Sequence, residues 1–299
     1  MVTLSTLFAI AVDGLAFGVF LSLLGVGITL VFGLGEVLNL SIGVFSVVAV
    51  LVASTFVSGS NLVVAVVAGI VLTAVLGLVV DRTLLDPVYR SVGEQRILLG
   101  IFTTLGLTVF LDGFLINGLD LSSVAGWLVI PAFPGSYRIP LNAPNVPFAG
   151  TVILGSSLVV IGVGALVLAV LFLFLDRTFI GKAARTVFQD EVGAQLVGVN
   201  PRRIRTLIFV LSVTVAGFAG LLWAMGHNIA VSDGFVYTTF ALIVSIVGGV
   251  RNLVGAVVAG VLLGFVNQFA SFFVGSYIAS VILFSAAIVF LLAKPEAIS

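Results

Sequence analysis

Few side chains that could do chemistry lie inside the long apolar runs of this sequence. The ionisable ones in or beside those runs are Asp13, Glu36, Asp112 and His227. An ionisable group deep in a bilayer is a functional hypothesis by default. All but Asp13 fall near the expected ends of apolar runs, where water can solvate them, and no acidic residue is expected at mid-span opposite a basic one. This pattern argues against a proton- or sodium-coupled carrier with a carboxylate relay.

Common catalytic and metal-binding motifs are missing from the sequence. It has no cysteine and one histidine, which excludes disulfides, thiolate chemistry and multi-histidine metal centres. It has no GxSxG or HExxH motif. The only Gly-Lys pair, Gly181-Lys182, is followed by Ala183 and has Asp176 in place of the first P-loop glycine, so the chain cannot bind ATP by a P-loop of its own. We expect no catalytic residue, no metal or cofactor, and no enzyme activity.

The composition is that of an integral membrane protein. Of the 299 residues, 61% are hydrophobic and 8% are charged, whereas a soluble domain carries roughly 45–50% and about 25%. The formal net charge of zero leaves no basic field for nucleic acid. Backbone groups in lipid must bond internally, and long unbroken apolar runs suit helices better than the alternating strands of a barrel. The expected fold is all-α, a polytopic membrane protein.

Apolar segments of membrane-crossing length recur along the chain. A crossing needs about 20 residues, and segment 235–250 is short for one. We expect eight or nine transmembrane helices in a single transmembrane domain over 1–299, with the first segment retained rather than cleaved as a signal peptide. Two small-residue pairs that let helix backbones approach closely are Gly14/Gly18 and Gly260/Gly264. The segments are 7–32, 38–57, 62–80, 97–119, 150–175, 206–226, 235–250, 254–273 and 277–293.

The positions of lysine and arginine orient these segments. Linkers 81–96 and 176–205 are rich in arginine, whereas 120–149 carries only Arg138. Because cytoplasmic loops carry the excess of basic residues, the two basic linkers are expected in the cytoplasm and 120–149 outside it. Nine crossings place the N-terminus outside and the C-terminus inside. With eight crossings, one short segment is re-entrant and one end changes side.

Linker 176–205 suggests more than an orientation signal. Residues 181–199 can form one amphipathic helix, and Pro201 blocks its continuation. The charges off its apolar face are mixed in sign, which favours a protein partner over anionic lipid. The apolar face contains Ala184, Val187, Phe188, Gly193, Ala194 and Val197, and the charges are Lys182, Arg185, Asp190 and Glu191.

Two glycine-rich stretches interrupt the apolar pattern, one in each half of the chain. Residues 33–43 and 248–255 each combine glycines, an asparagine and a charge. Interrupted segments of this kind often line a translocation path, because unwound backbone supplies polar groups. Tight interhelical turns are the alternative. We expect Asn39, Ser41 and Gly43 to line or flank a solute path, with a simple helix-capping role for Asn39 as the other interpretation.

The linker from Thr178 to Asn200 resembles the signature loop of the permease subunits of branched-chain amino acid ABC transporters. The family's order of Thr, Gly, small residues, Arg, acid, Ala and a closing Leu-x-Gly-Ile/Val-Asn recurs here, and the Gln189-Asp190 pair favours the LivH type over the LivM type. Residues 13–33, 219–222 and 247–260 resemble further stretches of that family. The resemblance implies that the residues coupling this loop to an ATPase are Gly181, Lys182, Ala183, Arg185, Asp190, Glu191, Ala194, Gly198 and Asn200.

One stretch departs from the family pattern. Where the family usually reads Asn-Phe-Ala-His-Gly-Glu, this chain reads Asn39-Leu40-Ser41-Ile42-Gly43-Val44, so the histidine and the acid are replaced by apolar residues. If those side chains touch the solute or a gate, the resemblance implies a different solute. Similar permeases serve urea, short amides and other amino acids.

The resemblance also implies a set of partners, besides membrane lipid. A second permease subunit of the LivM type would complete a pore in the cytoplasmic membrane, and two cytoplasmic ATP-binding subunits would bind below it. An extracytoplasmic solute-binding protein would deliver branched-chain amino acids or a similar small solute. The rival class, which the residues alone leave open, is a gradient-driven secondary transporter or channel for a small neutral solute.

Overall fold

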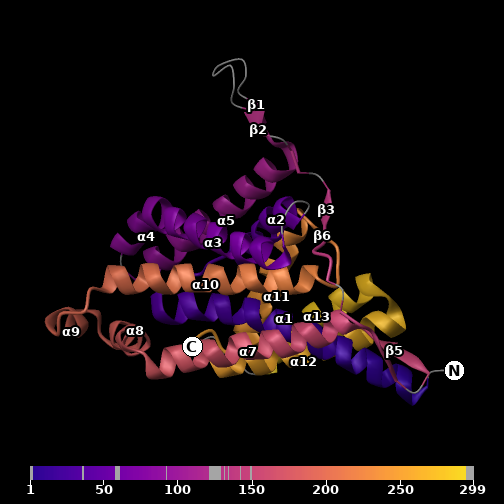
Figure 1. Cartoon of the computed structure of the whole chain (residues 1–299). Helices are drawn as coiled ribbons and strands as arrows, with labels where there is room; N and C mark the ends of the chain where they lie inside the picture. The colour runs from indigo at the N-terminus through magenta and orange to yellow at the C-terminus, as the bar shows by residue number, and fades with distance from the viewer. Residues whose placement is uncertain are drawn as a thin grey trace.

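A computed structural model describes residues 3–35, 37–57, 61–91, 93–120, 129–130, 132–133, 135–141, 143–148 and 150–293. Within these residues the chain is mostly helical, as the composition predicts. Long helices lie side by side across the molecule (Figure 1). The helices, long and short, are α1 (Leu4–Gly35), α2 (Ile42–Val57), α3 (Leu62–Val80), α4 (Asp86–Arg90), α5 (Glu94–Asn117), α7 (Gly155–Arg177), α8 (Phe179–Gln189), α9 (Glu191–Leu196), α10 (Pro201–Ala224), α11 (Asp233–Gly248), α12 (Leu253–Val274) and α13 (Ser276–Ala293).

Among the described residues, six helices are long and apolar enough to cross a membrane. They are α1, α5, α7, α10, α12 and the continuous helix that runs from the start of α3 to the end of α4. The apolar helices α2, α11 and the Ser276–Phe290 part of α13 are shorter. Every expected apolar segment is therefore mostly helical, and the chain is a multi-pass membrane protein, but among the described residues six helices rather than eight or nine have full crossing length.

The basic linker 81–96 is not a loop throughout, which corrects the expected boundary. A π-helical turn, η1 (Asp81–Leu85), joins α3 to α4, so the helix continues to Arg90. Asp81 is buried and its carboxylate accepts a hydrogen bond from Thr206 Oγ1 on α10 at 2.6 Å. This bond fixes the extra turns against α10 and leaves a short connection before α5.

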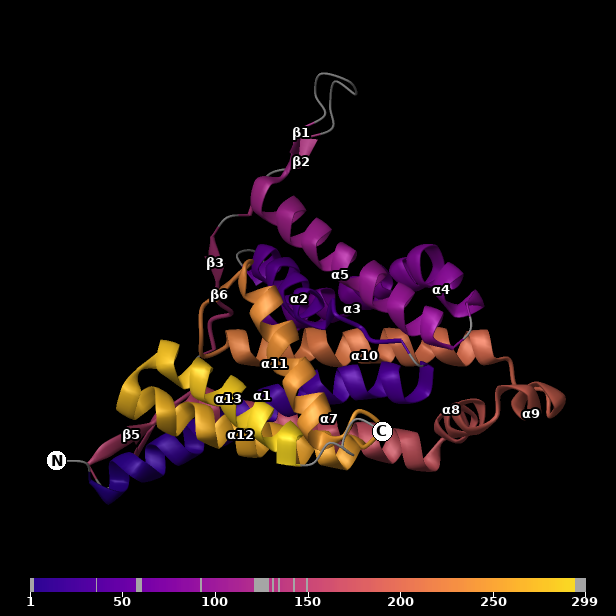
Figure 2. The same cartoon turned by 180° about the vertical axis from the view of Figure 1, so that it is seen from behind.

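The first helix lies at the centre of the bundle. In its most apolar stretch 89% of α1 is buried, against 28% for the helix beginning at α3. Figures 1 and 2 both show α1 between α10 on one side and α7 and α12 on the other. A helix that is apolar all round needs such a buried position, and the outer helices turn one face to lipid.

Glycines set the close contact between α1 and α12, as the small-residue pairs predict. A Cβ added to Gly264 would overlap the Cα of Gly18, and one added to Gly260 would lie 2.7 Å from the Cα of Ser22. The Ser22 hydroxyl donates across the same contact to the Val257 carbonyl at 2.9 Å. Small residues therefore hold these two backbones together.

Replacing Gly264 by alanine should separate α1 from α12. The added methyl group meets backbone atoms, which cannot rotate away, so the folded protein should lose about 1–3 kcal/mol of stability, the usual cost of overpacking. Thermal unfolding of the purified protein in detergent would measure the loss. Gly162 on α7 has nothing within 4 Å of an added Cβ, so Gly162→Ala is the matched control, and equal stability of the two variants would contradict the packing assignment.

Short strand pairs form in the connections between helices. They are β1 (Leu119–Asp120) with β2 (Val129–Ile130), β3 (Ser136–Tyr137) with β6 (Ile229–Ala230), and β4 (Val146–Phe148) with β5 (Thr151–Ile153), all antiparallel. Segment 120–149, expected as a connecting loop, therefore contains short strands, and the described chain as a whole remains mostly helical. The three pairs lie away from α8 and α9 (Figure 1), so the arginine-poor connection and the basic loop occupy different ends of the molecule.

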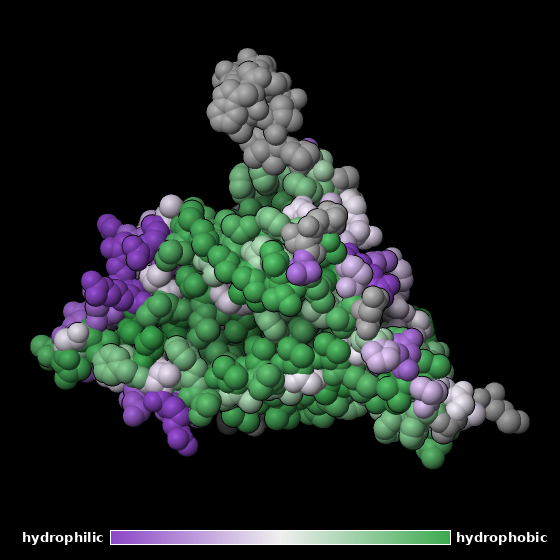
Figure 3. All heavy atoms as spheres, in the orientation of Figure 1, coloured by the Kyte–Doolittle hydropathy of each residue, from purple (hydrophilic) through white to green (hydrophobic). Residues whose placement is uncertain are grey.

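The surface matches this division into two ends. A broad hydrophobic belt covers the helices in Figure 3, and hydrophilic residues gather where α4, α8 and α9 lie. A smaller hydrophilic area lies near β3 and β6. A belt of this kind is the surface expected of a protein surrounded by lipid.

Candidate functional site

The basic loop between α7 and α10 folds as two short helices rather than the single helix expected over 181–199. Thr178 caps α8 by accepting the Gly181 N–H at 3.2 Å. Asp190 has extended backbone dihedrals and caps α9 by accepting the Gly193 N–H at 2.9 Å. The capping aspartate therefore breaks the helix. Asn200 caps α10, and Pro201 opens that helix in the first turn, where proline is tolerated.

The loop helices turn small residues inward and charges outward, as the amphipathic pattern predicts. Gly181, Ala183, Ala184, Val187 and Ala194 are buried, whereas Lys182, Arg185 and Asp190 are exposed. Gly181 admits no side chain, because an added Cβ would lie within van der Waals overlap of the Leu175 backbone. These contacts place the loop firmly on the end of α7.

An exposed apolar tip lies on the outer side of α9. Val192 is 67% exposed, Leu196 84% and Val197 73%. The expectation that Val197 faces inward is therefore wrong, because the helix ends at Leu196 and Gly198 turns the chain with a φ of 83°. Phe188 is partly buried, and the Arg251 guanidinium lies 5.2 Å from its ring centroid.

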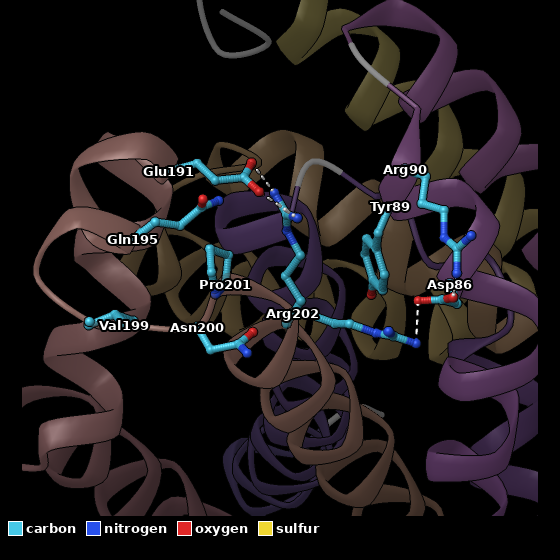
Figure 4. Close-up of a pocket in the computed structure, with 11 residues that line it drawn as sticks. Asp86, Tyr89, Arg90, Glu191, Gln195, Val199, Asn200, Pro201 and Arg202 are labelled. Carbon is cyan, nitrogen blue, oxygen red and sulfur yellow. Dashed lines mark hydrogen bonds and ion pairs between the residues drawn. The ribbon is translucent and has the colours of Figure 1, made fainter.

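Beside α9 lies a cavity of about 670 Å³, whose walls come from α4, α9 and the start of α10 (Figure 4). Glu191 reaches into it and accepts two hydrogen bonds from Arg205, at 3.0 and 2.6 Å. On the opposite wall Asp86 pairs with Arg202 at 2.6 Å and with Arg90 at 2.7 Å. The sequence alone did not indicate Arg205, Arg202 or Asp86, because nothing in their spacing shows that these helices meet.

The second candidate region is the connection between α1 and α2. Residues 37–41 are not helical, and α2 begins beside Gly27 of α1, where an added Cβ would lie 3.0 Å from Ile42 Cδ1. The Leu40 N–H donates to Thr104 Oγ1 at 3.0 Å, and Thr108 Oγ1 donates to the Leu40 carbonyl at 2.8 Å. Side chains of α5 thus satisfy unwound backbone inside the bundle, the situation in which such backbone is tolerated at membrane depth.

Asn39 and Ser41 are fully buried in this connection. Asn39 Oδ1 accepts the Ser41 N–H at 3.1 Å and the Ser41 hydroxyl at 2.6 Å. The bonded N–H belongs to the residue before α2, so Asn39 shapes the turn and does not cap the helix itself. Asn39 Nδ2 is buried and has no hydrogen-bond partner among the described residues.

Gly43 forms the closest contact between α2 and α11. Its N–H donates to Thr238 Oγ1 at 3.0 Å, and a Cβ in its place would overlap the Gly234 carbonyl oxygen. Asn39, Ser41 and Gly43 therefore meet at the start of α2, against α11 and α5.

The other glycine-rich stretch, 248–255, is a tight interhelical turn. Gly249 has a φ of 91°, and Asn252 caps α12 by accepting the Gly255 N–H at 3.0 Å. The structure brings the two interrupted stretches together, since an added Cβ on Gly33 would lie 3.6 Å from the Arg251 Cα. Through Arg251 this turn also contacts α8.

The ionisable residues of the apolar runs are scattered. The Asp13 carboxylate accepts a hydrogen bond from Ser157 at 2.7 Å, and Asp112 Oδ1 has no partner in the described part of the chain. The His227 ring stacks on Trp223, and burial lowers the pKa of this histidine below its ordinary value. Glu36 lies outside the described residues.

Comparison with known proteins gives one consistent result. A family model described as "branched-chain amino acid transport system / permease component" matches residues 10–292. The high-affinity branched-chain amino acid transport system permease protein BraD of Pseudomonas aeruginosa is 26% identical over 96% of this chain and 94% of that protein. The permease protein LivH of Escherichia coli is 24% identical over 96% and 93%.

Two further similarities are partial or structural. The permease protein LivM of Escherichia coli is 33% identical over 33% of this chain and 25% of LivM. The solved structure of PsaBC from Streptococcus pneumoniae in complex with Fab has a TM-score of 0.51 and 16% identity, with 94% of this chain and 90% of that one covered. That similarity concerns the fold.

Proposed function

We propose, since this chain belongs to the family of permease components of branched-chain amino acid transport systems, that it is the membrane-spanning permease subunit of an ATP-binding-cassette importer. It moves branched-chain amino acids or a similar small solute across the cytoplasmic membrane. The observation that carries this proposal is the match over residues 10–292, which includes every helix named as a membrane span except the first residues of α1.

Energy comes from separate subunits. The sequence has no GxxxxGK[ST] motif, so ATP hydrolysis belongs on two cytoplasmic ATP-binding subunits. The loop over 176–205 is the docking element for them, and its exposed apolar tip at Val192, Leu196 and Val197 supports this role. The coupling residues are Gly181, Lys182, Ala183, Arg185, Asp190, Glu191, Ala194, Gly198 and Asn200.

Two further partners complete the importer. Both LivH and LivM of Escherichia coli are similar to this chain and are named as permease proteins, which supports a second permease of the LivM type. An extracytoplasmic solute-binding protein delivers the solute to the end of the molecule that carries β3 and β6.

All nine apolar helices lie in the membrane in this proposal, in eight or nine crossings. The chain has no cysteine, so single cysteines report sidedness cleanly. A membrane-impermeant thiol reagent should label Ser136→Cys in intact cells but label Thr186→Cys only after the membrane is opened, because both positions are exposed and lie at opposite ends. The reverse pattern would overturn the orientation drawn from lysine and arginine.

The solute path passes the start of α2, where Asn39, Ser41 and Gly43 meet. Unwound backbone and the unpaired Asn39 amide supply polar groups there. Ile42 and Val44 make the surroundings apolar, which suits a neutral solute moiety. An uptake assay with labelled branched-chain amino acids, other amino acids and urea tests this, and we expect neutral apolar amino acids to be taken up best. Preference for urea or a charged amino acid would contradict the assignment.

A further inference from the structure

Glu191, the first residue of α9, is held by arginines from two other helices. Its carboxylate accepts a bidentate pair of hydrogen bonds from Arg205 of α10. Arg96 of α5 lies 3.9 Å from the same carboxylate. We call Glu191, Arg205 and Arg96 the Glu191 clamp. Through the clamp, the loop is attached to α5 as well as to α10, the helix that follows the loop in the chain.

The arginines of the clamp are more buried than those in the other charge pairs of the loop. Arg205 is 8% exposed and Arg96 is 9% exposed, and the Arg205 guanidinium lies 5.5 Å from the Tyr89 ring centroid. The pair between Arg185 and Asp176, by contrast, lies at the surface. Separating Glu191 from a buried guanidinium leaves a charge without its partner, which is strongly unfavourable. When α9 shifts, the arginines are therefore drawn with it.

Farther along the same helix, α5 holds the unwound connection between α1 and α2. Thr104 and Thr108 bond the N–H and the carbonyl of Leu40, and Val37 packs against Gly100. At 1.5 Å per residue, Thr104 lies about 12 Å from Arg96 along the helix. One rigid helix thus contacts the loop at one point and the start of α2 at another.

We infer that α5 carries a movement of α9 to the unwound segment 37–41, and that Glu191 is the positioning residue at which this movement enters. The inference rests on the proposed function, because it takes the loop as the docking element for ATP-binding subunits. A competing route on the same structure runs from Phe188 through Arg251 to the turn before α12. That route bypasses both Glu191 and Arg96, so substitutions in the clamp separate the two.

The test uses the complete transporter in proteoliposomes and measures solute moved per ATP hydrolysed. Glu191→Gln and Arg96→Gln should each lower this ratio at least about fivefold, the lower end of typical coupling factors. The double variant should lower the ratio no further than the more strongly affected single variant does, because both residues act on one contact. Glu94→Gln is the matched control, since Glu94 is exposed and lies on the same helix, and it should leave the ratio unchanged.

Thr108→Val tests the far end of α5 without touching the clamp. It removes the hydroxyl that donates to Leu40 and should lower the same ratio. An unchanged ratio in Glu191→Gln or in Thr108→Val, or multiplied effects in the Glu191/Arg96 double variant, would overturn the α5 route. If a clamp variant does not assemble, Thr108→Val alone decides.

The outcome separates this inference from the function itself. If the wild-type transporter shows ATP-driven uptake and the clamp variants keep the wild-type ratio of solute moved per ATP, the α5 route is refuted and the proposed function still holds. Wild-type transporter without ATP-driven uptake refutes the function. Variants that lose folded complex in proportion to uptake, with a normal ratio per ATP, assign the clamp a structural role only.

Discussion

Uptake should fall at least about 100-fold when Ala194 of α9 is replaced by aspartate. Ala194 is fully buried against the end of the bundle, and a carboxylate there has no partner and costs several kcal/mol to bury. The variant must release α9 from the bundle or protonate the new group. Release displaces the apolar tip at Leu196 and Val197 through which, in our proposal, ATP-binding subunits act, and even a protonated carboxyl group overpacks a site that holds only a methyl group.

ATP hydrolysis should continue in the same variant while uptake is lost. Both quantities are measured on the assembled transporter, together with the amount of permease in the membrane. Ala194→Ser is the control, because its hydroxyl can donate to the Asp190 carbonyl four residues earlier and should cost far less uptake. Normal uptake by Ala194→Asp would remove the coupling role of α9.

Asn39→Asp should lower uptake of neutral amino acids at least tenfold. The replacement keeps the Oδ1 atom that accepts from Ser41 and changes only the unpaired Nδ2. What it adds is a negative charge inside the bundle, at the start of α2. If the solute passes this point, the added charge also favours cationic solutes, so the ratio of cationic to neutral uptake should rise.

The ratio of cationic to neutral uptake distinguishes a role of Asn39 in the solute path from a purely structural role. A structural defect at Asn39 would lower uptake of every solute by one factor and leave the ratio where it was. Asn61→Asp makes the same change at an exposed position before α3 and should leave both quantities unaltered. If Asn39→Asp gives a normal rate and a normal ratio, the solute path lies elsewhere.

The positions of the helices of this protein can be predicted from its sequence with little error. Segment 254–273 is α12 to within one residue at each end, and 62–80 is α3. Long apolar runs require internal backbone bonds, so the positions of the helices follow from hydropathy. Gly18 and Gly264 also meet as their spacing predicts.

The break in the basic loop has local signals in the sequence, although the amphipathic pattern predicts one helix there. Asp190 is a preferred capping residue, and Asn200 before Pro201 has the pattern of a helix start. The amphipathic pattern of 181–199 nevertheless predicts one continuous helix, because two short helices that run in similar directions can share one apolar face. The helix extension to Arg90 depends on the bond from Thr206 to Asp81 and could not be predicted locally.

The contacts of the Glu191 clamp and of the threonines on α5 could not be predicted from the sequence. Glu191, Arg205 and Arg96 come from three helices, and ordinary solvated charges have the same local sequence. In the sequence, Thr104 and Thr108 are ordinary polar residues of an apolar helix. Only the structure shows that both bond the backbone of Leu40. The sites of interest are therefore those where tertiary contact, rather than periodicity, decides the role of a residue.

In the proposed function, this chain moves a small solute with energy supplied by separate ATP-binding subunits. The most direct measurement is uptake of labelled leucine into proteoliposomes that contain the permease pair, with the ATP-binding subunits and the solute-binding protein added or omitted. We predict uptake that requires ATP and all of these components and that a proton or sodium gradient cannot replace. Leucine uptake by this chain without ATP-binding subunits, driven by an ion gradient, would contradict the account.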